Sequence, residues 1–184
     1  MFFGFFLFSN TYAQNPEQHL IEAKKLNNRS WSKRAINLAK EQMKLPLGTF
    51  PTLSSVDTYK IRFRTRGPKN ESVESSGLIL LPTERSTPPS LLSYLHATRL
   101  HFKEAPSYQR FDPEVQALSL LFASNSYVVS MPDYLGLEEN SAGVQYYLNA
   151  NTQALVALDM LRATEEFLNQ KQISYSKNLF IAGY

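Results

Sequence analysis

The chain has 184 residues, of which 43% are hydrophobic, so it has room for one globular domain with a sizeable core. Its net charge of +3 arises within residues 17–45, where seven basic side chains outnumber three acidic ones. Because no nucleic-acid-reading module accompanies this stretch, we expect a solvated helix surface and no nucleic-acid partner. Since no segment approaches the roughly 20 apolar residues that span a bilayer, no integral membrane span is expected.

The first residues form a short apolar run, Phe2–Phe8, which is followed by polar residues and then by Thr11-Tyr12-Ala13. This order predicts a signal peptide over residues 1–13, with cleavage after Ala13, and a secreted or periplasmic protein. A positively charged start is missing, so a buried hydrophobic first strand is the alternative. The absence of cysteine fits a bacterial envelope or a cytosolic protein.

Residues 14–55 are predicted to form an N-terminal helical segment and a loop. One or two helices are expected within residues 17–45, with a break at Asn27-Asn28, and prolines and glycine mark the loop that follows. The apolar residues that fall partly on one helix face are Leu20, Ile21, Ala35, Ile36, Ala39 and Met43.

The remainder, residues 56–184, opens with two strand-like runs, Val56–Arg66 and Val73–Leu81. Apolar and charged residues alternate in the first run, which is the period-2 pattern of a half-buried strand. The turn signal at residues 67–70 (GPKN) lies between the runs and predicts an antiparallel hairpin.

From residue 88 the pattern changes to strands that alternate with helices. Short apolar runs at 91–95, 127–131 and 178–182 predict buried strands, and residues 149–168 predict the strongest helix. Asp112-Pro113-Glu114 marks the start of another helix, with an acidic N-cap and proline at the first helical position. The sequence therefore predicts the α/β class, with a mostly parallel sheet behind an antiparallel hairpin.

Open α/β sheets place their active groups at the carboxyl ends of the strands. Here these ends are His96-Ala97-Thr98, Pro132–Gly136 and Gly183-Tyr184. No glycine-rich phosphate loop is present, and neither cysteine ligands nor an H-E-x-x-H motif occur. No cofactor and no metal are therefore expected.

Taken in order, these strand ends resemble the α/β-hydrolase superfamily, in particular its secretory lipase and esterase-like branch. The resemblance runs from about Val56 to Tyr184 and rests on SGLILLP (76–82), HAT (96–98), SMPDYLGL (130–137), LDMLRA (158–163) and FIAGY (180–184). The superfamily continues the last stretch as G-Y-S-x-G, in which a sharp turn exposes the nucleophilic serine. By this resemblance, the sequence stops just before that serine, at the start of the nucleophile elbow (Gly183, Tyr184), and the sheet is incomplete on its C-terminal side.

The resemblance also assigns roles at the other two strand ends. It makes the Thr98 N–H a candidate oxyanion-hole donor, with His96 and Ala97 supporting its loop. Alanine stands at 97 where the family usually has glycine, so a positive φ there would be strained. Asp133 and Gly136 are expected to shape a structural turn, and Glu138 stands where a glycine is common.

The resemblance implies a serine hydrolase whose full-length form acts on small-molecule or lipid esters, with the acyl pocket and lid beyond residue 184. The serine, acid and histidine of its triad would also lie beyond the sequence, so the 184 residues alone are expected to be inactive. One alternative is a non-catalytic binding module that uses an exposed strand edge, through which the chain would also self-associate. Another is attachment of the basic N-terminal helices to an anionic membrane surface.

Overall fold

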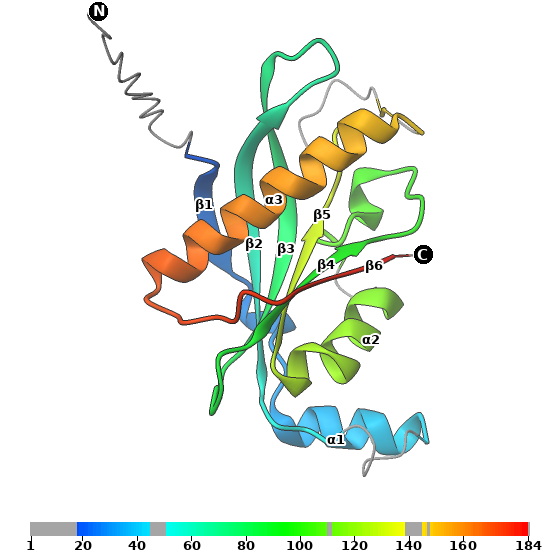
Figure 1. Cartoon of the computed structure of the whole chain (residues 1–184). Coiled ribbons are helices and arrows are strands. Elements are labelled where there is room, and N and C mark those ends of the chain that lie inside the picture. Colours follow the sequence, from blue (N-terminus) through cyan, green and yellow to red (C-terminus); the bar gives the residue numbers. More distant parts are fainter. Residues whose placement is uncertain (1–17, 45–50, 110–111, 139–144, 147, 184) are drawn as a thin grey trace, which may run out of the picture.

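The computed structural model describes residues 18–44, 51–109, 112–138, 145, 146 and 148–183. The predicted signal peptide and Tyr184 lie outside these residues. Six strands form one sheet with the order β1-β2-β3-β5-β4-β6. A long helix crosses one face of this sheet, and two shorter helices lie toward its other side (Figure 1).

The antiparallel half of the sheet is built by β1 (Leu20–Lys25), β2 (Val56–Arg66) and β3 (Ser72–Pro82). Strands β2 and β3 form the predicted hairpin, and their register runs unbroken from Val56 opposite Pro82 to Arg66 opposite Ser72. Strand β3 then pairs antiparallel with β5 (Tyr127–Pro132).

The parallel half consists of β5, β4 (Ser90–Leu95) and β6 (Leu179–Gly183). Because these three strands run in the same direction, their carboxyl ends meet at one edge of the sheet. The predicted α/β class is therefore confirmed, and β6 is the outer strand on this side among the described residues.

The helices are α1 (Lys33–Gln42), α2 (Pro113–Leu121) and α3 (Ala150–Gln170), with 3-10 turns η1 (Asn27–Arg29), η2 (Phe102–Glu104) and η3 (Ala123–Asn125). The N-cap predicted for α2 is confirmed, because the Asp112 carboxylate accepts hydrogen bonds from Glu114 N at 2.7 Å and Val115 N at 3.2 Å. The Asn149 side chain caps α3 in the same way, through Thr152 N at 3.1 Å.

Two apolar clusters hold the helices to opposite faces of the sheet. On β3, Ile79 belongs to the cluster beneath α3, whereas its neighbours Leu78 and Leu80 belong to the cluster beneath α2. This alternation follows from the strand period of two. At Gly77 an added Cβ would lie 2.6 Å from the Met131 carbonyl oxygen, so this crowded position in β3 has no room for a side chain.

The helix predicted at the start of residues 17–45 is wrong in part, because Leu20–Lys25 is a strand. Leu20 lies opposite Phe63 in the register with β2 and is buried. The Glu166 carboxylate of α3 also accepts hydrogen bonds from His19 N at 2.9 Å and Leu20 N at 2.7 Å. Pairing with the edge of β2 and the hydrogen bonds to Glu166 stabilise the strand more than the weak local helix propensity stabilises a helix.

A carboxylate also joins the segment before β2 to the turn after β3. Glu84 Oε2 accepts hydrogen bonds from the Thr83 hydroxyl at 2.6 Å, the Ser54 hydroxyl at 2.8 Å and Ser55 N at 2.7 Å. These hydrogen bonds lower the pKa of Glu84 to about 2, and the largest contribution comes from the Thr83 hydroxyl. Desolvation acts in the opposite direction and raises the pKa.

This lowered pKa predicts an acid-dependent loss of stability. The carboxylate stabilises the fold above its ordinary pKa of 4.5, and this contribution is lost as the pH falls toward about 2, because the unfolded chain then binds the proton more readily. In Glu84→Gln the urea midpoint should lie below that of the wild type at pH 6, and the gap should narrow toward pH 2. A gap that is the same at both pH values would contradict the role given to the charge.

Candidate functional site

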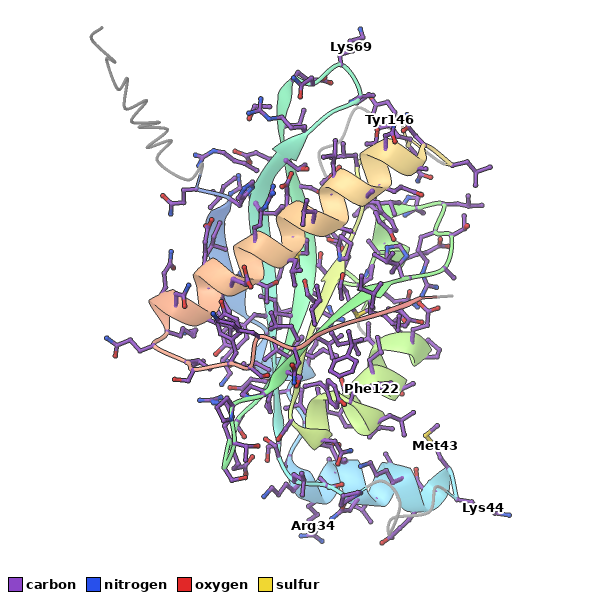
Figure 2. The ribbon with its side chains drawn as sticks, viewed as in Figure 1. Arg34, Met43, Lys44, Lys69, Phe122 and Tyr146 are labelled. Atoms are coloured by element: carbon purple, nitrogen blue, oxygen red, sulfur yellow. The ribbon has the colours of Figure 1, made fainter. Side chains whose placement is uncertain are left out.

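A cavity of about 380 Å³ opens where β4, β5 and β6 end, a size within the range of small-molecule sites. Its walls come from these strand ends and from the first turns of α3. Tyr146, also in the lining, lies beside the N-terminal end of α3 (Figure 2). The lining residues are Leu95, His96, Thr98, Arg99, Tyr134, Leu135, Leu137, Gln145, Tyr146, Leu148, Thr152, Gln153, Val156 and Gly183.

The loop that follows β4 contains the predicted oxyanion residues. His96 and Thr98 both line the cavity. Within the described part of the chain, the Thr98 backbone N–H makes no hydrogen bond, so no protein acceptor occupies it there. Ala97 does not have a positive φ, so the strain expected from alanine at this position is absent.

The His96 imidazole contacts both this loop and the turn that follows β5. Its Nδ1 lies 2.6 Å from the Ala97 carbonyl oxygen, and since that oxygen can only accept, Nδ1 is the donor. The ring packs on Tyr134 with 4.7 Å between centroids, and His96 is 5% exposed. Nε2 finds no hydrogen-bond partner among the described residues. These contacts fit a residue that orders the loop.

Gly183, the last described residue of β6, lies beside Leu95 at the end of β4. An added Cβ at 183 would lie 2.9 Å from the Leu95 carbonyl oxygen, so only glycine fits here without a shift. The predicted elbow start at Gly183 and the candidate donor Thr98 therefore border the same cavity.

Asp133 follows β5 directly and is fully buried. Its carboxylate accepts hydrogen bonds from Ser107 N at 2.9 Å and from the hydroxyls of Ser107 and Ser76, both at 2.5 Å. Asp133 is not part of the cavity lining. Its contacts join the end of β5 to β3 and to the loop between β4 and α2.

A tight turn over Tyr134–Leu137 carries three of the lining residues. Tyr134 and Gly136 have positive φ values of 66° and 91°, and Leu137 N donates to the Tyr134 carbonyl at 3.3 Å. Burial raises the pKa of Tyr134 to about 12, so its phenol stays protonated at neutral pH. Glu138 accepts hydrogen bonds from Gly136 N at 2.9 Å and from the Ser75 hydroxyl at 2.8 Å, and its pKa is raised, chiefly by burial.

Arg99 forms one wall of the cavity and is held by two acids at the start of α2. Its guanidinium donates to Asp112 at 3.0 Å and to Glu114 at 2.7 Å. Sequence reasoning did not find Arg99 as a site residue, nor the cavity residues Tyr134, Gln145 and Gln153. Three of them have a positional signal, because Arg99 and Tyr134 follow strand ends and Gln153 lies in the first turn of α3, whereas Gln145 precedes α3 and has no such signal.

Neither a metal site nor a membrane span is found in the described residues. No group of three or more His, Cys, Asp or Glu side chains is arranged there to hold a metal ion. No helix of the described part is both long and apolar enough to cross a bilayer.

No protein-family model matches the chain, and no curated protein matches its sequence. Solved structures do match. A candidate hydrolase of Legionella pneumophila is 30% identical, with a TM-score of 0.79 over 90% of this chain and 44% of its own. The rice cell wall degrading esterase LipA of Xanthomonas oryzae is 25% identical, with a TM-score of 0.75 over 92% and 42%.

Candida antarctica lipase A, at 15% identity and a TM-score of 0.54, shares the fold over 91% of this chain and 35% of its own. The chain thus spans less than half the length of these proteins. These proteins are named as a hydrolase, an esterase and a lipase. The structural match to them extends over nearly the whole chain. The chain therefore has the α/β-hydrolase fold.

Proposed function

We propose that this chain is the N-terminal part of a secreted serine ester hydrolase, and that it supplies half of the oxyanion hole and much of the substrate cavity. The observation that carries this proposal is the single cavity bordered by both Thr98 and Gly183. A serine placed directly after the elbow would face the same space as the free Thr98 N–H, as acyl transfer requires. The names of the similar solved structures agree with this activity.

The substrate class follows from the cavity walls. Half of the lining residues are leucine, valine or tyrosine, and the charge of Arg99 is already matched by Asp112 and Glu114. We therefore propose an ester with a compact, uncharged acyl group. Part of the acyl pocket then lies before residue 184, where the family resemblance had not placed it.

We further propose that residues 1–184 alone do not hydrolyse esters. Among the described residues no serine hydroxyl is hydrogen-bonded to an imidazole: His19 contacts Arg64 and Asp159, His96 contacts Ala97, and His101 accepts from Lys103 N. A serine without such a base is a weak nucleophile. One oxyanion-hole donor can bind a carbonyl oxygen, but hydrolysis also needs a nucleophile that attacks the carbonyl carbon.

A non-catalytic binding module is the second candidate. It is favoured by the exposed apolar side chains of Leu179, Phe180 and Ile181 on β6, which has no neighbour on one side among the described strands. An exposed strand edge can pair with another chain, including a second copy. A stable dimer that leaves the cavity unable to bind an ester analogue would favour this candidate over the first.

The purified chain should bind an uncleavable ester analogue without turning over the ester. We expect N-(4-nitrophenyl)butanamide to bind in the cavity by calorimetry, and 4-nitrophenyl butyrate to be hydrolysed no faster than in a blank. Gln153→Trp, which fills the cavity from α3, should weaken binding about tenfold or more. Ala154→Trp places the same bulk on the exposed neighbouring position and is the control.

Two results would contradict this account. Turnover of the butyrate above the blank would show that the isolated chain has a working nucleophile. Equal loss of affinity in Gln153→Trp and Ala154→Trp, or no binding to the wild type, would show that the cavity is not the ester site.

We propose that residues 1–13 direct export. When the chain is produced with its own N-terminus in a secreting bacterium, the mature protein should begin at Gln14, as N-terminal sequencing or intact mass can establish. Retention of Met1 in a protein that stays inside the cell would contradict this proposal.

A further inference from the structure

The segment before β2 reaches the loop between β4 and α2 through one side chain. Arg29, the last residue of η1, donates from Nη1 to the Ser107 carbonyl at 3.0 Å and from Nη2 to the Pro106 carbonyl at 2.8 Å. A guanidinium suits this task because its planar fork can serve two acceptors at once. The contact joins residues 78 positions apart.

Arg29 is itself held in place from β2. Its carbonyl oxygen accepts from the Thr58 hydroxyl at 2.9 Å, and Leu26 N donates to the Thr58 carbonyl at 2.8 Å. Burial lowers the pKa of Arg29, and the nearby carboxylates of Asp133 and Asp112 raise it in return. The guanidinium therefore acts from a fixed base in the sheet.

The contact continues beyond Ser107. The Ser107 N–H and hydroxyl both donate to the buried Asp133 carboxylate, which also binds Ser76 on β3. Tyr108, the next residue, lies under the Lys60 ammonium, which is 3.2 Å from the ring centroid. Loop residues 106–108 are thus fixed from η1, from β2 and from the end of β5.

From this geometry we propose that Arg29 is a positioning residue for the loop of residues 96–109, and so for the Thr98 N–H and the cavity wall. The loop has two anchors: Arg99 with Asp112 and Glu114 on one side, and Ser107 with Arg29 and Asp133 on the other. Thr98 lies next to the Arg99 anchor. The Ser107 anchor restrains the other end of the loop and so limits the movement of Thr98. A donor contributes to binding an oxyanion only when it is held in place beforehand. The catalytic importance of this loop rests on the proposed function.

Hydrogen exchange of the whole chain tests this proposal without any need for catalysis. In Arg29→Ala the hydrogen-bonded amides within residues 97–109, those of Ser107 and Tyr108 above all, should exchange about tenfold faster or more, since two charge-assisted hydrogen bonds to the loop are lost. Amides of the β2–β3 hairpin should keep their wild-type rates. Arg29→Lys should show most of the effect, because an ammonium cannot span the two carbonyls. Arg34→Ala, an exposed arginine on α1, is the charge-matched control.

Affinity for N-(4-nitrophenyl)butanamide supplies the second readout and should fall in Arg29→Ala and Arg29→Lys but not in Arg34→Ala. Wild-type exchange of residues 97–109 in both Arg29 variants would overturn the proposal. Faster exchange that is spread equally over the hairpin and the loop would also overturn it, since Arg29 would then only stabilise the fold. If the wild type fails to bind the amide, the proposed function falls, while the loop exchange still decides the role of Arg29.

Discussion

The buried carboxylate of Asp133 is the interaction on which the site depends. It stands one residue beyond β5 and accepts three hydrogen bonds from two serines, one on β3 and one on the loop after β4. A fully buried carboxylate is costly unless its lone pairs are satisfied, and here the donors come from separate parts of the chain. If Ser107 moved away, this buried carboxylate would lose two of its three hydrogen bonds. The hydrogen bonds that offset the desolvation of this carboxylate therefore also fix the loop at Ser107.

The cavity is a consequence of how the sheet is covered. Parallel strands β4, β5 and β6 end at one edge, α3 lies over one face, and residues 96–109 lie beyond the end of β4 (Figure 1). Thr98 and Arg99 on this loop meet Gln153 and Val156 of α3 across the space. The walls are therefore built by residues before 184.

Much of this arrangement could be predicted from the sequence because it depends on local patterns. Alternation along Val56–Arg66 and the Asp112-Pro113 cap each reflect neighbouring residues, and both were confirmed. His96, Thr98 and Gly183 could be placed at one edge because each follows a buried strand. The N-terminal segment could not, since Leu20–Lys25 takes its conformation from β2 and α3. Nor could Arg29, whose acceptors lie 77 and 78 positions further along the chain.

The most direct test of the account is the affinity of an Asp133→Ala variant for N-(4-nitrophenyl)butanamide, measured at a temperature where circular dichroism shows it folded. Asp57→Ala, which removes a carboxylate paired with Lys25 away from the loop, is the control. Asp133→Ala should lose about tenfold or more in affinity, since Ser107 and the loop lose their anchor. A folded Asp133→Ala protein that binds the amide as tightly as the wild type would contradict the claim that this carboxylate holds the site together.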